Sequence, residues 1–377
     1  MIETIKKSNY INSFLGLRFI VVTCLFFHHL DMFNSLNIPG WVDKWMPWFN
    51  EGYFSVNFFF ILSGFVVSYG YTERLKNHDV TQKKFILNRF AHLWPTHILA
   101  LAVCLIVYKS GKTIISHLTN PVLWLNALML HAWIPDMSGS IAFSYNGLAW
   151  TVSAEWFCYF AFLLILRLSR KERWLLTGTA WAFIICNAWL GAQGIISVQT
   201  WIYYINPLFR MADFMLGMAL FDLYKQGIFK PKSKTVASLS EIMAIVILVA
   251  FIVIAVKMPS INWTWRWQIF YTLPSALLVY VFSFNLGILS RILSSSIFRQ
   301  LGKLALPIYL FHQIVLALCK QYALPYLDSN IAIVATSIVA FMITLILAWI
   351  IERVYTTPID RLLRNKLLKL QTNSKNV

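Results

Sequence analysis

Apolar residues form long runs in this chain, and short polar segments, many of them basic, separate these runs. A run of about 20 apolar residues can cross a bilayer as one helix. Ten runs approach or exceed this length, at 14–34, 53–72, 90–109, 147–167, 174–191, 204–224, 236–256, 268–289, 303–323 and 331–351. The pattern therefore predicts an all-α polytopic membrane protein with about ten transmembrane helices.

The apolar stretch from Pro121 to Trp133 is only 13 residues long, which is short for a span. If it crossed the membrane, every later loop would change sides and the basic segment 167–174 would fall outside. We therefore expect a short interfacial or re-entrant helix near 121–133 on the outer face. It belongs to an outer segment of about 110–146, and a connection of that length is usually functional.

The basic residues set the predicted orientation. Most of the 32 Lys and Arg residues lie in alternate loops and at the two ends of the chain, which the positive-inside rule assigns to the cytoplasm. Both termini are therefore predicted to be cytoplasmic. Residues 1–352 form the predicted integral-membrane domain, and residues 353–377 form a basic cytoplasmic tail that we expect to lie as a helix on the membrane lipids. No soluble catalytic domain is expected after the last span, so any chemistry belongs to the membrane domain.

Composition narrows the possible functions. A chain that is 59% hydrophobic and 12% charged is not an ordinary soluble domain. The net charge is +17, and the basic residues that produce it lie mainly between the apolar runs. We therefore interpret them as a topology signal and expect no nucleic-acid partner. The five cysteines form no CxxC pair and are interpreted as packing residues, so no disulfide, metal site or permanently bound cofactor is expected. Walker, GxGxxG, HExxH and GxSxG motifs are absent from the sequence.

The first apolar run carries two groups that are costly inside a membrane, Arg18 and His29. Eleven residues separate them, which is three helical turns plus roughly 20°, or roughly 16 Å along the axis. Both side chains therefore lie on one stripe of the helix, where they could hold the two ends of one long ligand. The alternative is an arginine that reaches the interface and a histidine bonded within the core.

Two further groups are candidates for chemistry. Arg89 and His92 begin the third span at its inner end, where cations suit a phosphate-bearing ligand, although they could also serve as topology signals alone. Glu155 lies in the fourth span at a predicted depth similar to that of His29 and needs a cationic or imidazole partner. An imidazole held by a carboxylate is suited to take a proton from a hydroxyl. Together these groups predict group transfer across the membrane.

Other polar residues in the predicted spans are possible cavity-lining groups. Arg210 and Asp213 are three residues apart and are expected to pair. His312 is either a bonded core group or a catalytic one. The full set of possible cavity-lining residues is Asn57, Ser153, Arg210, Asp213 and His312.

Several sequence motifs occur in the order found in the membrane acyltransferase-3 family, which the chain resembles from about residue 10 to 360. LGLRFIVVTCLFFHH resembles the family's arginine, ten residues, histidine signature, matched by Arg18 and His29. FFFILSGFVVS resembles its second-span motif. RFAHLWP is similar to R-x-x-R-x-x-P, with Arg89 matching and His92 at the second arginine.

The later part of the chain continues this order. WTVSAEWFCYF resembles the family's WSLSxE-xxFY motif, matched by Ser153, Glu155 and Tyr159. FRMADFMLGM resembles R-x-x-E-F-x-x-G, with Asp213 as the acid. LGKLALPIYLFHQ and ERVYTTP complete the series.

The resemblance implies an O-acyltransferase of the bacterial inner membrane. Acyl-CoA, with acetyl as the expected group and succinyl as an alternative, would be the cytoplasmic co-substrate, and a hydroxyl of a surface polysaccharide or lipid-linked glycan would be the acceptor. By this resemblance Arg18, Arg89 and His92 would bind the donor, and His29 would be the general base supported by Glu155. A membrane transporter and an acyl-group exporter without transferase chemistry are the alternative functions, because intramembrane charges suit them too.

Overall fold

The computed structural model describes residues 11–36, 38, 40–108, 116–197, 199–323, 326 and 328–373. The described residues form helices and no β-strands, which confirms the predicted all-α class. The main helices are α1 (Asn12–His28), α2 (Met46–Phe49), α3 (Phe54–Lys76), α4 (Gln82–Tyr108), α6 (Pro121–Ala127), α7 (Trp150–Ile165), α8 (Arg170–Ala192), α9 (Pro207–Lys225), α10 (Lys234–Lys257), α11 (Trp263–Trp265), α12 (Thr272–Ser283), α13 (Ile288–Leu293), α14 (Ser296–Lys303), α15 (Ala305–Ala323), α16 (Asn330–Ile350) and α17 (Thr357–Asn373).

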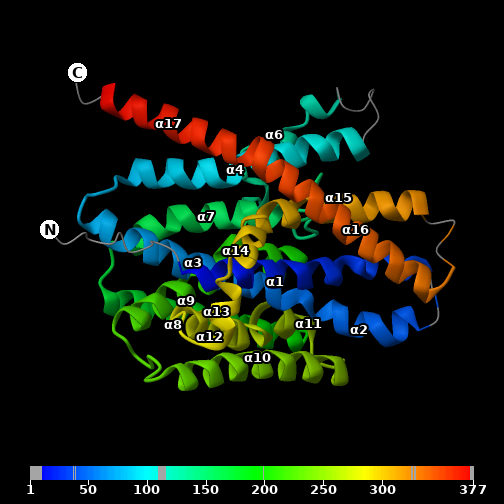
Figure 1. Cartoon of the computed structure of the whole chain (residues 1–377), viewed down its shortest axis with the longest axis horizontal. Coiled ribbons are helices and arrows are strands. Elements are labelled where there is room, and N and C mark those ends of the chain that lie inside the picture. Colours follow the sequence, from blue (N-terminus) through cyan, green and yellow to red (C-terminus); the bar gives the residue numbers. More distant parts are fainter. Residues whose placement is uncertain are drawn as a thin grey trace.

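Short tighter or wider helical turns join these helices. They are η1 (His29–Leu36), η2 (Trp41–Trp45), η3 (Asn50–Tyr53), η4 (His131–Trp133), η5 (Trp201–Ile205), η6 (Arg266–Phe270) and η8 (Ile351–Thr356). In Figure 1 most of the long helices run roughly along the long axis of the molecule, and the start of α1 and the end of α17 both lie in the left half of the view.

Each of the ten predicted spans contains one of these helices. Six helical segments in the described part of the chain are long and apolar enough to cross a membrane, and a seventh is added if α14 and α15, bent by 59°, form one span. The apolar helix α7 is shorter, α9 carries Arg210 and Asp213 in its interior, and α12 has only 12 residues. The six long apolar segments support a multi-pass membrane protein. The count of ten spans and the orientation of the termini stay predictions.

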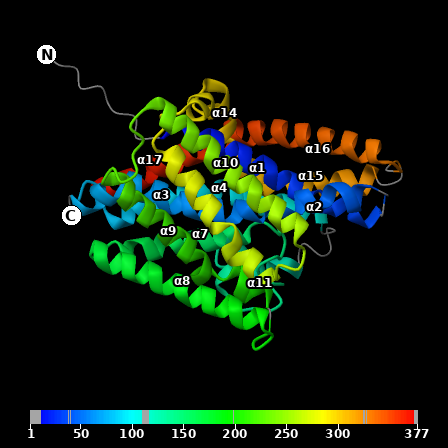
Figure 2. The same ribbon diagram turned by 90° about the horizontal axis from the view of Figure 1, so that it is seen from below.

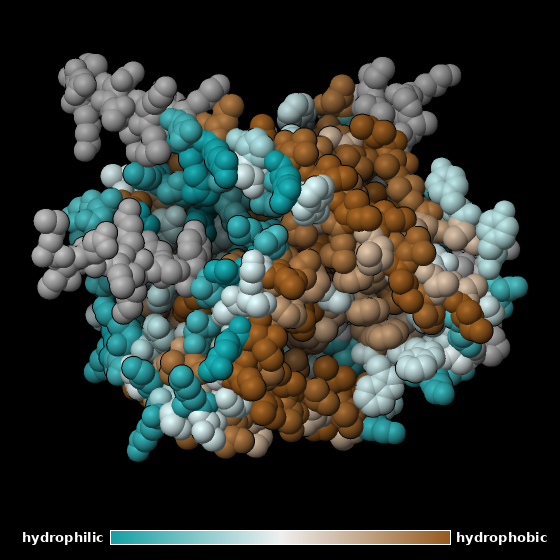
Figure 3. All heavy atoms as spheres, viewed as in Figure 1, coloured by the Kyte–Doolittle hydropathy of each residue, from teal (hydrophilic) through white to brown (hydrophobic). Residues whose placement is uncertain are grey.

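The helices differ in how much apolar surface they leave exposed. In the segment Trp41–Lys76, which contains α3, 78% of the most apolar window is buried, against 17% for α10 and 22% for α8. Helix α3 is therefore central, and α8, α10 and α16 are peripheral. Figure 2 shows α8 and α16 at opposite edges of the molecule, and Figure 1 shows α10 along its lower edge. Figure 3 shows hydrophobic side chains over the middle of one face and hydrophilic ones gathered toward its left. Exposed apolar surface of this extent suits contact with lipid.

Glycines bring the central helices into backbone contact. A Cβ atom added at Gly64 of α3 would lie 1.9 Å from the carbonyl oxygen of Phe214 in α9, and one added at Gly217 of α9 would lie 2.0 Å from that of Ile61. Each of the two helices thus places one glycine against the backbone of the other helix. Small residues at such contacts let membrane helices pack closely.

The segment 121–133 is a short helix followed by a single helical turn, α6 and η4, as the sequence predicts for a stretch too short to span. Helix α6 begins at Pro121, and the side chain of Asn120 caps it by accepting a hydrogen bond from the backbone N–H of Val122 at 2.9 Å. Proline and an asparagine cap at this position are typical of helix starts.

Candidate active site

A cavity of about 210 Å³ lies at the end of α1. At about 30 Å³ per water molecule, it has room for roughly seven waters. The lining residues come from α1, η1, α3, α7 and the loop before it, η5 and α15: Leu25, His29, Val56, Phe143, Gly147, Leu148, Trp150, Tyr204, Tyr309 and Gln313. The cavity is thus mainly aromatic and apolar, with an imidazole, an amide and tyrosine hydroxyls as its polar groups, which is typical of a ligand site.

The end of α1 positions the imidazole of His29 at this cavity. The α-helix ends at His28, and His29 begins the tighter helical turn η1. Its ring Nδ1 lies 3.0 Å from the carbonyl oxygen of Leu25, one turn back. Carbonyls in the last turn of a helix are available for such contacts.

A second histidine from α15 completes the arrangement. His312 is fully buried, its Nδ1 lies 2.9 Å from the carbonyl oxygen of Ile308, and its Nε2 lies 3.0 Å from Nδ1 of His29. A carbonyl oxygen only accepts, so Nδ1 of His312 carries the proton and its Nε2 is an acceptor in the neutral ring. Nδ1 of His29 must then donate, which leaves the Nε2 of a neutral His29 unprotonated. His29 is therefore held in the tautomer that a general base requires.

Glu155 lies in a different environment from His29. Its Oε1 accepts hydrogen bonds from the hydroxyl of Ser63 at 2.5 Å and from that of Tyr159 at 2.6 Å. Among the described residues, the structure does not bring this carboxylate into hydrogen-bond contact with His29, whose imidazole bonds instead to His312. Similar predicted depth in the membrane does not imply lateral contact, because Glu155 and His29 face different neighbours in the bundle. The charge of Glu155 acts instead on the guanidinium of Arg89.

The expected donor-binding residues lie together. The guanidinium of Arg89 donates a hydrogen bond to the hydroxyl of Tyr71 at 3.0 Å and lies 4.9 Å from the centre of that ring and 5.8 Å from the ring of Tyr159. His92 is exposed, and the charges of Arg18, Arg89 and Arg364 all act on its imidazole. We call Arg18, Arg89, His92 and Arg364 the cationic cluster. Sequence reasoning missed Arg364, which it assigned to a surface tail.

Helix α1 connects this cluster with the cavity. The α-helix is continuous from Asn12 to His28, and Arg18 lies within it while His29 follows directly at its end, roughly 16 Å away along the axis. This arrangement agrees with the single stripe that the sequence spacing predicts.

Three of the possible cavity-lining residues form a buried polar network. Arg210 and Asp213 pair at 3.1 Å, which confirms the expected ion pair within α9. The side-chain amide of Asn57 donates to both carboxylate oxygens of Asp213 and to the hydroxyl of Thr272, each at 3.2 Å. Asn57, Arg210 and Asp213 are each 1% exposed and lie outside the set that lines the cavity beside His29. The network joins α3, α9 and α12 and leaves these charges paired.

Ser153 is fully buried and attaches the segment after α6 to α7. Its hydroxyl donates to the carbonyl oxygen of Met129 at 2.8 Å and accepts from the backbone N–H of Ala132 at 3.1 Å. Its own carbonyl accepts from the indole N–H of Trp133 at 2.9 Å. Ser153 therefore positions the segment that follows α6 and is not among the residues that line the cavity.

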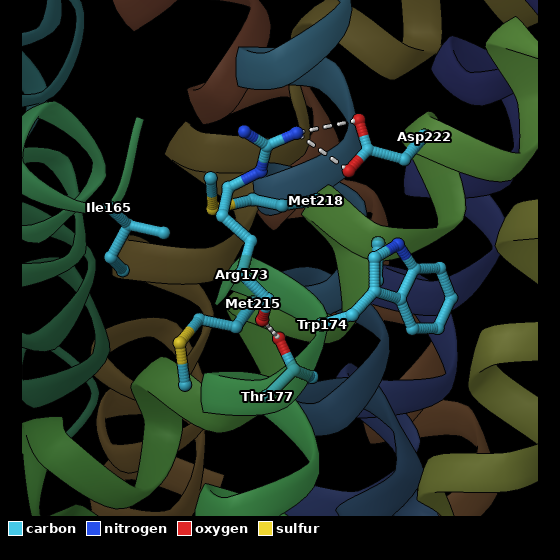
Figure 4. A pocket seen from close by; sticks show the side chains of 8 residues that line it. Ile165, Arg173, Trp174, Thr177, Met215, Met218 and Asp222 are labelled. Atoms are coloured by element: carbon cyan, nitrogen blue, oxygen red, sulfur yellow. Dashed lines mark hydrogen bonds and ion pairs between the residues drawn. The ribbon is translucent and has the colours of Figure 1, made fainter. Parts of the chain in front are cut away.

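A crevice between α8 and α9 has no room for a ligand (Figure 4). Arg173 and Asp222 form an ion pair across it at 2.8 Å, and it holds no space for a water molecule. The hydroxyl of Thr177 donates to the carbonyl oxygen of Arg173 at 2.8 Å, which fixes the helix beside the pair. This crevice is a packed contact between two helices.

The fold and site define a multi-pass helical membrane protein with a paired imidazole at an aromatic cavity and a cationic cluster about three turns away along the same helix. The chain belongs to a family of acyltransferases, because the family model described as acyltransferase domain matches residues 11–353. This match confirms the resemblance read from the motifs.

Two relatives are similar to parts of the chain. Acyltransferase MdmB of Streptomyces mycarofaciens is 28% identical over 202 residues, which cover 48% of this chain and 48% of that protein. Protein 2 in the picA locus of Rhizobium radiobacter is 42% identical over 53 residues, 14% of this chain and 28% of that protein. The chain thus spans half or less of each relative's length. No solved structure matches it.

Proposed function

We propose that this protein is an O-acyltransferase of the bacterial inner membrane that moves an acyl group from acyl-CoA to a hydroxyl of a surface polysaccharide or lipid-linked glycan. Acetyl is the proposed acyl group. The observation that carries the proposal is the bond between Nδ1 of His29 and Nε2 of His312, which leaves Nε2 of His29 as a proton acceptor beside a cavity. Membership of an acyltransferase family supports the reaction class.

The cationic cluster is the proposed binding site for the phosphates of acyl-CoA. Guanidinium groups bind phosphate oxygens through two parallel hydrogen bonds, and Arg89 is already oriented by Tyr71. The pantetheine arm would then follow α1 from Arg18 toward the cavity. This path would place the thioester near His29.

The proposed reaction at the cavity is a direct acyl transfer. Nε2 of His29 takes the proton of the acceptor hydroxyl while the oxygen attacks the thioester carbonyl carbon. The C–S bond breaks, the sulfur of CoA leaves as a thiolate, and the imidazolium of His29 returns the proton to it. His312 orients His29 and shares the positive charge that develops on its ring.

The aromatic lining of the cavity suits a sugar acceptor. Trp150 and Tyr204 lie with ring centres 4.9 Å apart, and both line the cavity with Phe143. Aromatic faces pack against the C–H faces of sugar rings, while Gln313 offers an amide for hydroxyl groups. The name of the Streptomyces relative, an acyltransferase, supports the same reaction class without indicating an acceptor.

The test compares membranes from cells that carry the wild-type protein, His29→Ala or His28→Ala, each supplied with labelled acetyl-CoA. His28 is the matched control, because its Nδ1 contacts the carbonyl oxygen of Phe49 and its side chain does not line the cavity. We expect label on extracted surface polysaccharide with the wild type and with His28→Ala, and a loss of about 100-fold or more with His29→Ala. Equal labelling by His29→Ala, or no labelling from any acyl-CoA with the wild type, would contradict the proposal.

A further inference from the structure

Helix α17 lies beyond residue 353, where the match to the family model ends. It continues from α16 through the wide turn η8 and packs against α4 (Figure 1). Its position brings a segment from the end of the chain against the helix that carries Arg89 and His92. The sequence alone predicts a tail on the lipid surface, so this contact is a property of the tertiary structure.

Contacts with residues of α4 and α17 fix the side chain of Arg364 in place. Its guanidinium donates to the side-chain oxygen of Asn88 at 3.1 Å and to the carbonyl oxygen of Asn88 at 3.3 Å. Its Nε donates to the two carboxylate oxygens of Asp360, one turn earlier in α17, at 2.9 and 2.8 Å. An arginine held at several atoms keeps one orientation and loses little entropy when it binds an anion.

These contacts place Arg364 beside the cationic cluster. Asn88 precedes Arg89 directly and lies four residues before His92, so Asn88 and His92 share one face of α4. The side chain of Arg364 remains 31% exposed, and His92 is exposed. The side chain of Arg364 is therefore partly accessible where it contacts the face of α4 that carries His92.

The cluster concentrates positive charge from three separate helices. Arg18 lies on α1, Arg89 and His92 lie on α4, and Arg364 lies on α17, all within electrostatic range of His92. Like charges held together repel one another, and a bound polyanion relieves this repulsion. Asp360 balances one of the charges through its ion pair with Arg364 at 2.7 Å. The charge of Glu155 acts on Arg89. The three arginines still outnumber these two carboxylates, and the excess of positive charge fits a phosphate-bearing ligand.

We propose that Arg364 is a donor-binding residue, and that the contact of α17 with α4 completes a phosphate site shared with Arg18 and Arg89. This inference rests on the proposed function, because it assigns the phosphates to acyl-CoA. It makes the C-terminal helix part of the donor site. Arg364 would contact the phosphates and would take no part in the proton transfer at His29.

The experiment uses purified full-length protein and measures transfer from two acetyl thioesters, acetyl-CoA and S-acetylpantetheine, which lacks the phosphates. We expect Arg364→Ala to raise the KM for acetyl-CoA about tenfold with little change in kcat, and to leave the kinetics with S-acetylpantetheine unchanged. Arg361→Ala is the matched control, because Arg361 is an exposed arginine three residues earlier on the same helix. Equal KM values for Arg364→Ala and Arg361→Ala with acetyl-CoA would overturn the inference.

Two more variants separate phosphate binding from a packing role. Arg364→Lys keeps the charge and should recover part of the affinity for acetyl-CoA. Asp360→Asn removes the carboxylate that competes with phosphate for Arg364, so we expect an unchanged or lower KM. If Arg364 served only to dock α17, loss of its Asp360 partner would raise the KM as Arg364→Ala does, and this would contradict the inference. Absence of wild-type transfer from both thioesters would instead refute the proposed function itself.

Discussion

Two positions about three turns apart on the first helix carry different kinds of polar site. At the end of α1, His29 and His312 form an imidazole pair whose bonded nitrogens contact each other and backbone carbonyl oxygens, beside an aromatic cavity. Around Arg18, the cationic cluster gathers charges from three helices near the exposed His92. The first site controls the position of a proton, and the second attracts negative charge.

This difference separates two tasks that one long substrate requires. Proton transfer needs one imidazole in one tautomer, which hydrogen bonds to fixed carbonyl oxygens provide. Binding of a phosphate-bearing donor needs several cations held close together, which the cationic cluster provides. The helix that joins them fixes their separation at roughly 16 Å, so one extended molecule could reach both. The comparison predicts that mutations at the imidazole pair change kcat and that those in the cationic cluster change KM.

After substitution of His29 itself, the largest loss of kcat is expected from substitution of His312. His312→Ala removes the acceptor that holds Nδ1 of His29, so kcat should fall by about 10- to 100-fold while the KM for acetyl-CoA stays constant. Steady-state kinetics on purified protein would measure both constants. Because the two rings act as a unit, a double variant with His29→Ala should be no slower than His29→Ala alone. A double variant that loses activity additively would show that His312 acts apart from His29.

A smaller effect, confined to KM, is expected from Arg89. Arg89→Ala should raise the KM for acetyl-CoA about tenfold with little change in kcat, because it removes a charged contact to phosphate. The KM of Arg89→Lys should lie between the values of the wild type and Arg89→Ala, since lysine keeps the charge but loses the planar stacking on Tyr71. Salt titration of the KM provides a second measurement, because screening weakens a phosphate contact. A fall in kcat with an unchanged KM would remove the distinction between the two sites.

The smallest change in the kinetic constants is expected from a substitution of Glu155. Whether kcat or KM changes shows to which of the two sites this residue belongs. Its carboxylate bonds to Tyr159, whose ring lies under the guanidinium of Arg89. Glu155→Gln keeps a hydrogen-bond acceptor but removes the charge, so we expect a rise of about two- to fivefold in the KM for acetyl-CoA and little change in kcat. Tyr159→Phe, which removes only the hydroxyl, should act in the same direction. A selective fall in kcat would instead assign Glu155 to the proton-transfer site, as the sequence resemblance implies.

Much of the local structure can be predicted from the sequence. Each apolar run contains a helix, the short run at 121–133 forms only a short helix and a turn, and Arg210 pairs with Asp213. These features depend on residues near one another in the chain, through helical periodicity and the cost of unpaired charge in an apolar segment. The same local rules place Arg18 and His29 on one stripe of one helix.

The contacts between distant residues could not be predicted in this way. His29 and His312 are 283 residues apart, and their bond depends on how α1 packs against α15. The expected support of His29 by Glu155 rested on similar depth, and depth does not specify which faces of two helices meet. Helix α17 presents a similar case, because its basic composition suits a lipid surface as well as a protein contact.

The sequence by itself determined a helical membrane protein of an acyltransferase family, with an arginine and a histidine about three turns apart on one stripe of the first helix. Periodicity and motif order carry that information, because they concern positions along one chain. Only the tertiary structure decided that His312 orients His29, that Glu155 lies near Arg89, and that Arg364 joins the cationic cluster. The physical reason is that lateral packing selects which side chains meet, and this selection depends on close contacts such as those of Gly64 and Gly217 between α3 and α9.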